Sequence, residues 1–403
     1  SLVRPAAEGT LTLRLNATNL DQQTAGFIVG EGSYRDERTA KSNPNPEAYR
    51  EARSLRASAH YAFSRGEAED YDLRLMLRSS RMDFLQHFLL GKPLEENGQD
   101  SVSVLLSRAL PAGGGRLIMG LDGEYASGFL EQTQAAPATG GPPAALAIRP
   151  PGKQYDYEVR SLLGASYLHW ARPLGARLEL TAGLRAEWLR YDYDNRMLDG
   201  NTDQNGVPCG FGGCLYNRPA DRQDDFVNVG PRLSLAWRPD EASTAWVALS
   251  RGFRPPEATE LYRLQRGQDV ADLDSERIQG IELGYRRIGE GLSLELAAFH
   301  MDKDEVILRD AFGFNVSDGR TRHAGVEYDV EWRPVAGLSL AAAGTFARHT
   351  YRFTGAIEQG ERVRRGDDVD TAPRQLHNVR LGYDAERWRG ELEWVYVDEY
   401  WAN

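Results

Sequence analysis

The sequence contains no apolar run long enough to cross a bilayer as a helix. A spanning helix needs about 18 or more consecutive apolar residues, and the mean hydropathy of the chain is −0.54. This excludes a helical membrane protein. It leaves a membrane-spanning barrel open, because only every second residue of a barrel strand faces lipid.

Positive charge is scarce as well. The 403 residues carry 48 Lys and Arg against 59 Asp and Glu, which gives a formal net charge of −11. Proteins that bind nucleic acid need an excess of positive charge to neutralise phosphates. We therefore expect no nucleic-acid partner.

Catalytic motifs are also missing. The seven histidines form no H-E-x-x-H or similar metal spacing, and no G-x-S-x-G nucleophile motif occurs. The acidic clusters at Asp302–Glu305 and Asp367–Asp370 are typical of solvated loops. We expect no enzyme, no catalytic residue, no cofactor and no metal site.

Only two cysteines are present, Cys209 and Cys214, within C-G-F-G-G-C. We expect them to form a disulfide that closes a small loop in an oxidising compartment, worth about 2 kcal/mol by the chain-entropy relation. A metal-binding or redox pair is the alternative, which the lack of a nearby His or third Cys disfavours.

The pattern that fills most of the chain is alternation with a period of two. In the segment Arg177–Trp188 the even positions are apolar from Leu178 to Trp188, and the odd positions are polar or small from Arg177 to Glu187. The same pattern recurs at Arg232–Arg238, Val326–Arg333 and Glu391–Tyr396. Such strands can face hydrocarbon on one side and water on the other. Placing an Arg at the bilayer midplane costs about 2–4 kcal/mol, so the charged face should line the lumen.

The connections between about sixteen expected strands alternate between short and long. This is the anatomy of an antiparallel up-and-down β-barrel with short periplasmic turns and long extracellular loops. A soluble sandwich would also alternate along its strands, and a propeller would show a 40–50-residue repeat, which is absent. The expected short turns lie near Asp21, Gly66, Gly113, Pro173, Pro239, Gly289, Ala336 and Glu386, and the expected long loops are Asp36–Ala48, Met82–Gly98, Gly128–Gln154, Asp194–Asp225, Arg254–Ser275, Lys303–Gly313 and Thr354–Pro373.

Aromatic residues gather near the strand ends opposite the short turns. We expect them to form an interfacial girdle, with ordinary cross-strand packing as the alternative. The residues concerned are Trp188, Tyr191 and Tyr193, and Tyr396, Tyr400 and Trp401.

The segment Ser250–Tyr285 carries three motifs in order: F-R-x-P at Phe253–Pro256, E-L-Y at Glu260–Tyr262, and a strand that opens at Leu273–Glu276 and continues with x-E-x-G at Glu282–Gly284. Further matches follow at Asn315–Glu327 and at Ala372–Tyr383. Together they resemble the barrel of TonB-dependent outer-membrane receptors. Two departures are Pro255 and Ser275, where relatives often have Ala and Pro.

The resemblance implies a 22-stranded barrel with an N-terminal plug domain, in the outer membrane of a Gram-negative bacterium. Receptors of this family import scarce nutrients, most often ferric siderophores, with energy delivered by TonB through a TonB box before the plug. We expect residues 1–403 to be part of such a barrel domain, cut at both ends, with the signal peptide, plug, TonB box and C-terminal strands lying outside it. The expected partners are TonB, a ferric siderophore or similar iron complex, and outer-membrane lipid and lipopolysaccharide.

We expect the ligand to bind at the long loops. Arginine and aromatic side chains suit an anionic ferric chelate, although the same residues could merely shape the loop or contact lipopolysaccharide phosphates. Haem receptors of the family place a ligand His in this region. No His lies between Arg254 and Leu273 here, which disfavours haem as the ligand. The expected ligand-binding residues are Phe253, Arg254, Tyr262, Arg263 and Arg266.

A passive porin for small polar solutes is the alternative function, because about sixteen strands are enough to close a pore. For a receptor, we expect that deleting Arg254–Ser275 abolishes ligand binding and that trimming the Pro-, Ala- and Gly-rich Gly128–Gln154 does not.

Overall fold

The computed structural model describes residues 1–66 and 68–401. Sixteen strands form one antiparallel sheet in which each strand pairs with its neighbours in the chain, a meander with no crossover. The strands are β1 (Leu2–Ala6), β2 (Gly9–Gln23), β3 (Tyr49–Arg65), β4 (Glu69–Leu85), β5 (Leu94–Ala112), β6 (Gly115–Gln134), β7 (Gly152–Leu174), β8 (Leu178–Asn195), β10 (Arg222–Trp237), β11 (Ser243–Arg254), β13 (Glu276–Ile288), β14 (Leu292–Arg309), β15 (Asn315–Val335), β16 (Leu338–Tyr351), β19 (Gln375–Ala385) and β20 (Trp388–Val397).

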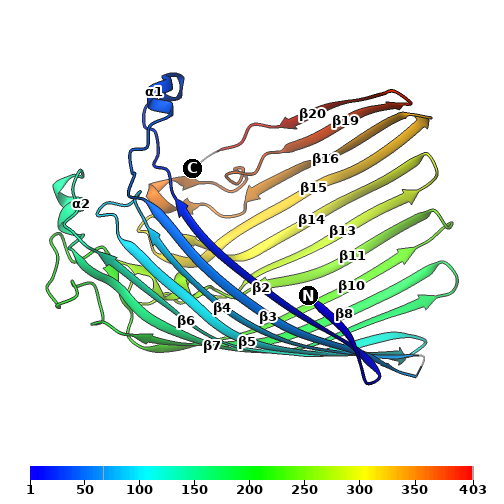
Figure 1. Ribbon diagram of the computed structural model, residues 1–403, viewed down its shortest axis with the longest axis horizontal. Helices are drawn as coiled ribbons and strands as arrows, with labels where there is room; N and C mark the ends of the chain where they lie inside the picture. Colours follow the sequence, from blue (N-terminus) through cyan, green and yellow to red (C-terminus); the bar gives the residue numbers. More distant parts are fainter. Residues whose placement is uncertain (67, 402–403) are drawn as a thin grey trace.

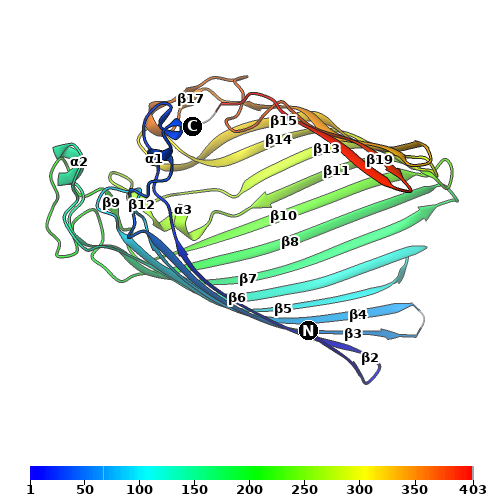
Figure 2. The same cartoon turned by 45° about the horizontal axis from the view of Figure 1, so that its top comes forward.

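The prediction of an all-β, up-and-down antiparallel fold with about sixteen strands is confirmed. The sheet curls as a barrel wall does but is not closed within the described residues, since β1 and β20 are its two outer members and do not pair. Figures 1 and 2 show the strands running side by side, and Figure 1 shows β2 and β20 apart.

Long and short connections alternate along the whole chain, as predicted. The long ones carry η1 (Ser33–Arg35), α1 (Glu37–Ala40), α2 (Pro143–Ala147), α3 (Ala258–Tyr262) and η2 (Glu358–Gly360), and the helices and the loop strands near them gather at one end of the sheet in Figures 1 and 2. Two small sheets also lie in these connections, β9 (Tyr216–Asn217) with β12 (Leu264–Gln265) and β17 (Gly355–Ala356) with β18 (Arg362–Val363). Within the described residues no helix is long and apolar enough to cross a bilayer.

Short hairpins close the other end of the sheet. Gly113 and Gly114 form a two-residue turn between the paired Ala112 and Gly115, and both have positive φ, as hairpin turns of this kind require. The turn expected near Asp21 is wrong: Asp21 lies within β2 opposite Glu51, and the first turn is at residues 7–8. Near the long loops the strands carry polar residues on both faces, so the alternation of apolar and polar residues ends before the strand does. Several long loops are therefore shorter than predicted from the sequence, and two of them cover residues 135–151 and 310–314.

The two faces of the sheet divide as the alternation predicts. On the convex face the apolar side chains of β8, β10 and β15 are exposed, with Leu184, Leu233 and Val326 between 44% and 47% accessible. On the concave face Arg185 donates to Asp122 (2.6 Å) and to Glu187 (2.8 Å). The inner wall therefore holds paired charges, and the outer wall is apolar.

The prediction of an interfacial girdle is wrong for Tyr191 and Tyr193. Trp188 does lie on the convex face, where its indole N–H donates to Asp225 (2.9 Å). Tyr191 and Tyr193 share the odd parity of Arg185, so they point to the concave face, where Tyr193 is only 1% exposed. The placement of Tyr396, Tyr400 and Trp401 in a girdle stays a prediction.

Candidate functional site

The connection 255–275 is fixed at its base by Arg254, the last residue of β11. The guanidinium donates to both carboxylate oxygens of Glu260 (3.0 and 3.0 Å) and to Glu276 at the start of β13 (2.7 Å). Glu260 also accepts the backbone N–H of Glu257 (2.6 Å), which closes a capping box at the first turn of α3. The charged residues of the three sequence motifs thus meet at one point and fold the loop back on its own strands.

Glu276 is the most enclosed member of this group, with 4% of its surface exposed. It also pairs with Lys303 (2.9 Å) and accepts the backbone N–H of Ile307 (3.0 Å). Burial alone would raise the pKa of the Glu276 carboxyl, but the hydrogen bonds from Arg254 and Lys303 outweigh it and hold the pKa at about 2. Its outward neighbours at this level are the polar Arg277 and Gln279, which places it beyond the apolar band of the sheet.

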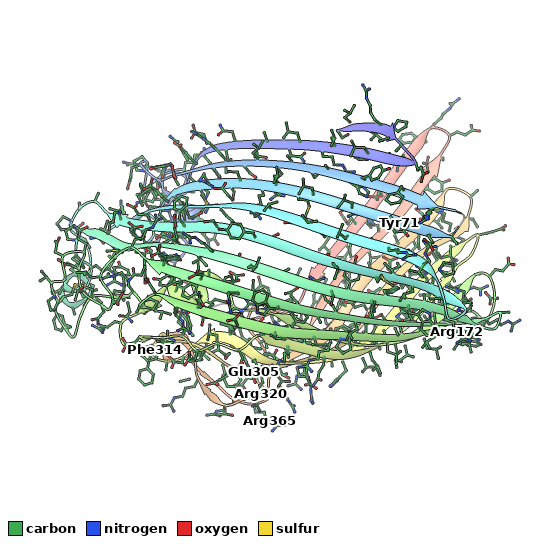
Figure 3. All side chains as sticks on the ribbon, turned by 90° about the horizontal axis from the view of Figure 1, so that it is seen from below. Tyr71, Arg172, Glu305, Phe314, Arg320 and Arg365 are labelled. Atoms are coloured by element: carbon green, nitrogen blue, oxygen red, sulfur yellow. A yellow bond between two sulfur atoms is a disulfide. The ribbon has the colours of Figure 1, made fainter. Side chains whose placement is uncertain are left out.

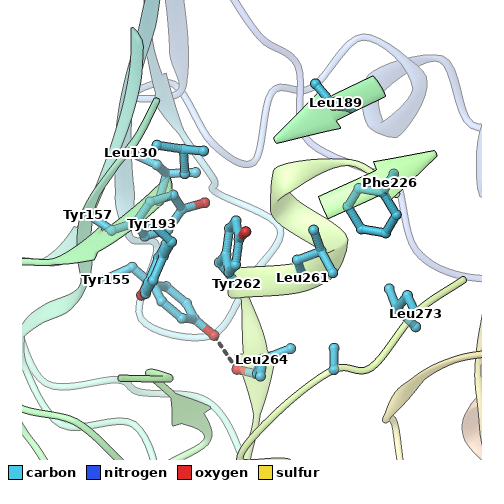
Figure 4. Close-up of a cluster of buried hydrophobic side chains, with 12 residues drawn as sticks. Leu130, Tyr155, Tyr157, Leu189, Tyr193, Phe226, Leu261, Tyr262, Leu264 and Leu273 are labelled. Atoms are coloured by element: carbon cyan, nitrogen blue, oxygen red, sulfur yellow. Dashed lines mark hydrogen bonds between the residues drawn. The ribbon is translucent and has the colours of Figure 1, made fainter. Parts of the chain in front are cut away.

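Helix α3 inserts two side chains into a buried cluster at the long-loop end of the concave face (Figure 4). Tyr262 is fully buried, stacks on Tyr193 with ring centroids 4.3 Å apart, and donates to Asp224 (2.7 Å). Burial, followed by the bond to Asp224, raises the pKa of the Tyr262 hydroxyl above its ordinary value. The mouth cluster comprises Leu130, Tyr155, Tyr157, Val159, Leu189, Tyr193, Phe226, Leu261, Tyr262, Leu264, Ala271 and Leu273.

The side chain of Arg263 contacts two strands, β5 and β6, that are distant from it in the sequence. It pairs with Glu95 of β5 (2.9 Å) and donates to Gln132 of β6 (3.1 Å), and its guanidinium lies 5.7 Å from the centre of the Tyr155 ring. Tyr155 in turn donates to the carbonyl of Leu264 (2.5 Å). These contacts hold the connection 255–275 inside the mouth of the barrel.

Arg266 ties the same connection to the neighbouring one, 196–221. Its guanidinium donates to the carbonyl of Phe211 (2.6 Å), and its backbone N–H donates to Leu215 (2.8 Å). Phe211 lies within the loop closed by the Cys209–Cys214 disulfide, whose sulfurs are 2.02 Å apart. Since β9 and β12 also pair here, the two connections form one unit.

Phe253 lies apart from the other four predicted ligand-binding residues. Successive strand residues point to opposite faces, and Phe253 is paired with Arg277 whereas Arg254 is paired with Glu276. The structure therefore brings Arg254, Tyr262, Arg263 and Arg266 together around one connection and places Phe253 on the other face of β11. The ligand-binding role of all five residues stays a prediction.

A cavity of about 570 Å³ lies on the concave side beneath α3. Its lining mixes charge and aromatic surface, with Arg78, Glu124, Tyr157, Tyr191 and Thr259 among the residues that face it. A polar, partly aromatic chamber of this size can hold a small chelate. Among the described residues no group of three or more His, Cys, Asp and Glu side chains is arranged to hold a metal ion.

Sequence reasoning missed the residues that receive the loop: Glu95, Gln132, Tyr155 and Asp224. Arg263 and Gln132 are 131 positions apart, and no local pattern links them. The inward direction of Tyr193 did have a signal, because its odd parity continues from Arg185.

Sequential antiparallel strands, an apolar outer face, a charged inner face and long connections folded into one mouth define the wall of an outer-membrane-type β-barrel. The chain belongs to the TonB-dependent receptor family, because the family model described as "TonB dependent receptor-like, beta-barrel" matches residues 4–403. The resemblance given by the motifs is thus confirmed. Members of this family are outer-membrane transport receptors of Gram-negative bacteria that bind TonB and small ligands such as siderophores.

Solved structures with the same fold include several receptors. The siderophore receptor PiuA from Acinetobacter baumannii superposes with a TM-score of 0.69 at 11% identity, over 97% of this chain and 62% of that one. The unliganded ferric citrate transporter FecA gives 0.70 at 15% identity over 98% and 55%, and the copper transporter OprC gives 0.69 at 12% over 97% and 57%. The chain therefore spans between 55% and 62% of the length of these three neighbours. A sequence comparison with curated proteins found no match.

Proposed function

We propose that this chain is the greater part of the barrel of an outer-membrane receptor that takes up a scarce nutrient with energy from TonB, and that this nutrient is a ferric siderophore or another iron complex. Membership of the TonB-dependent receptor family over residues 4–403 carries the proposal. The neighbours named above transport different ligands, so the iron complex rests on the chemistry of the mouth. An Arg-rich rim beside aromatic rings suits an anionic chelate.

We assign two roles within the mouth. Arg254, Tyr262 and Arg263 hold the connection 255–275 in place, since their polar groups are already paired with the carboxylates of Glu260, Glu276, Asp224 and Glu95. Arg266 lies further along the same connection, is partly exposed, and donates from its guanidinium to a backbone carbonyl. It is the cation that an arriving chelate would meet.

We further propose that the complete protein has a plug domain before this barrel and more strands beside it. Both edges of the sheet support the additional strands, because within the described residues β2 beyond Leu13 and β20 along its length each lack a partner on one side. The plug domain is what membership of the family implies. An unpaired strand edge in hydrocarbon is costly, so a spanning barrel must close. Outer-membrane lipid would then surround the apolar convex face.

Uptake measurements test the proposal. The complete protein is expressed in cells that lack their own receptors, and entry of a labelled ferric siderophore is followed with and without TonB. TonB-dependent entry supports the receptor. Entry that is equal without TonB, together with free passage of small sugars into liposomes, would establish the passive porin instead.

A further inference from the structure

Acidic side chains form one continuous row across six neighbouring strands, from β2 to β7. Cross-strand pairing places Glu51 directly opposite Asp21 on one side and directly opposite Asp83 on the other. The same register continues over three further strands. The acidic row comprises Asp21, Glu51, Asp83, Glu96, Glu131 and Asp156. Like charges directly opposite each other destabilise a sheet, so a row of this length is stabilised by any positive charge that approaches it.

The acidic row lies on the outside of the sheet, at the border of the apolar band. Successive strand residues point to opposite faces, so Glu51 shares the convex face with Leu55, and Asp83 shares it with Leu77. These two leucines are 49% and 50% exposed. Both lie on the short-turn side of the row, so the carboxylates border the apolar band at its long-loop end.

The chain neutralises one end of the row and leaves the other end charged. Lys153 pairs with Glu131 (2.9 Å) and with Asp156 (2.6 Å). Within residues 1–66 and 68–401, the four carboxylates on β2 to β5 are in no ion pair. In the next row toward the short turns Arg81 already pairs with a carboxylate outside the acidic row, which leaves Arg53 against the four.

An excess of arginine lies on the convex face of the facing wall, where a pocket of about 280 Å³ is found. Its charged lining includes Asp302, Asp304, Arg320, Arg322, Arg352 and Arg365. Arg322 is held by Asp302 in a two-pronged pair (2.7 and 3.2 Å). Figure 3 shows Arg320 and Arg365 near one another, projecting from the sheet.

Three of these arginines, Arg320, Arg352 and Arg365, form the arginine group. Arg320 has only a long contact with a carboxylate (3.9 Å), and in the described part of the chain neither Arg352 nor Arg365 is in an ion pair. Toward the short turns the convex face continues with Val326 and Phe346, which are 44% and 51% exposed. The arginine group therefore borders the apolar band at its long-loop end, as the acidic row does.

The two charged patches cannot meet within one molecule. The strands β2 to β5 and β13 to β16 lie on facing walls of the curled sheet (Figures 1 and 2), so their convex surfaces point away from each other. Because both patches border the apolar band at the same end, they lie at one height on barrels that stand side by side in a bilayer. The acidic row of one copy can therefore face the arginine group of the next.

We propose that these patches form an interface between copies of this chain, which associate side by side in the membrane with the four unpaired carboxylates of one copy against the arginine group of its neighbour. Complementary charge of this kind fixes which surfaces meet. Because the two patches differ, the contact is head-to-tail and repeats as an open row or a ring. The inference rests on the outer-membrane placement proposed above, but not on TonB or on the transported nutrient.

Two variants each remove one half of the contact. E51Q/D83N neutralises the middle of the acidic row, and R352Q/R365Q neutralises most of the arginine group. Neither variant breaks an ion pair among the described residues. A mixture of the two variants retains one functional patch on each partner, so it can form the contact once and cannot repeat it.

The matched controls are E290Q/E386Q and R387Q/R389Q, which make the same changes of charge at the short-turn end of the sheet. The complete protein carries one fluorophore and is inserted in one direction into vesicles of neutral phospholipid that contain no lipopolysaccharide. Photobleaching steps then count the copies in each cluster.

We expect clusters of three or more copies for the wild-type protein and for both controls, and association about tenfold weaker for each variant alone. The mixture of the two variants should form pairs and no longer rows. Equal clustering by the variants and the wild type, or rows as long as those of the wild type in the mixture, would overturn the proposal.

Two other causes of clustering are separated by additions to the same vesicles. Clusters that EDTA disperses would show that divalent cations bridge the carboxylates, and clusters that form only after lipopolysaccharide is added would show that lipid bridges the copies; either result rejects direct contact. Salt at about 1 M, where the Debye length is about 3 Å, should weaken the association. Loss of TonB-dependent uptake with clustering intact would count against the proposed transport function and leave this interface standing.

Discussion

Arg254 and Glu260, six residues apart, form a two-pronged ion pair with both distances at 3.0 Å, and this pair folds the chain back at the mouth of the barrel. Each residue belongs to a separate motif of the sequence, F-R-x-P and E-L-Y. The pair explains why the two motifs occur together: one supplies the cation and the other the carboxylate that reverses the chain.

Replacing Arg254 by Ala should therefore release the connection 255–275. Glu276, which is almost fully enclosed, would lose its shortest charged partner, and we expect the loop to be destabilised by roughly 2 kcal/mol, less than for a wholly buried pair because the guanidinium is partly exposed. Hydrogen exchange of residues 255–275 in detergent measures this. R35A, which removes an exposed arginine elsewhere, is the control, and unchanged protection in R254A would contradict the assigned role.

The same group should make the mouth sensitive to acid. Because the pKa of Glu276 is lowered from 4.5 to about 2, its stabilising contribution is fully present above pH 4.5 and is lost as the pH falls toward 2. We expect protection of 255–275 to decline over this window. In E276Q the carboxyl is absent, so protection should be lower throughout and lack this component of the pH dependence.

Gly284 should resist enlargement. A Cβ at this position would overlap the Trp246 indole, whose N–H donates to Glu282 (2.7 Å). We expect G284A to destabilise the barrel by about 1–3 kcal/mol through overpacking, measured by urea-induced unfolding in lipid vesicles. G123A is the matched control, because no atom of the described residues lies within 4 Å of the added Cβ. Similar losses in both variants would show that steric overlap with Trp246 is not the cause.

Removing the disulfide should loosen both connections of the mouth. Cys209 and Cys214 close a short loop, worth about 2 kcal/mol by the chain-entropy relation, and Phe211 within it accepts from Arg266. We expect C209S/C214S to raise hydrogen exchange in 196–221 and also near Arg266. A change confined to residues 209–214 would argue against coupling of the two connections.

Loop deletions separate ligand binding from packing. Deleting 256–274 should abolish binding of the transported chelate, whereas trimming 136–142 should not. The trim must stop there, because the carbonyl of Ile148 accepts from Leu215 (2.9 Å) and Ala147 packs beside Gly210. Calorimetry on the complete protein measures the binding of the chelate to each deletion variant. Equal loss of binding in both variants would contradict the assignment of the site to the connection 255–275.

The strands and their faces could be read from the sequence because a residue such as Leu184 or Arg185 reveals its side of the sheet through its neighbours alone. The same rule fails where both faces meet water, and the turn expected at Asp21 is an example. The strands that contact the connection 255–275 could not be predicted, because contacts such as that between Arg263 and Glu95 depend on how the whole sheet curls. Tyr193 lies between these cases. The sequence pattern predicts which face of the sheet it occupies, but it does not predict that Tyr193 stacks on Tyr262.

The joining of 196–221 to 255–275 through β9 and β12 has a consequence for engineering and for divergence among receptors. A new specificity cannot be grafted by exchanging one of these segments, since the transplanted piece would arrive without the strand, the carbonyl of Phe211 and the tyrosine rings that it packs against. The two segments have to be exchanged together, as a single cassette with the inward positions of β7 and β8 that receive it.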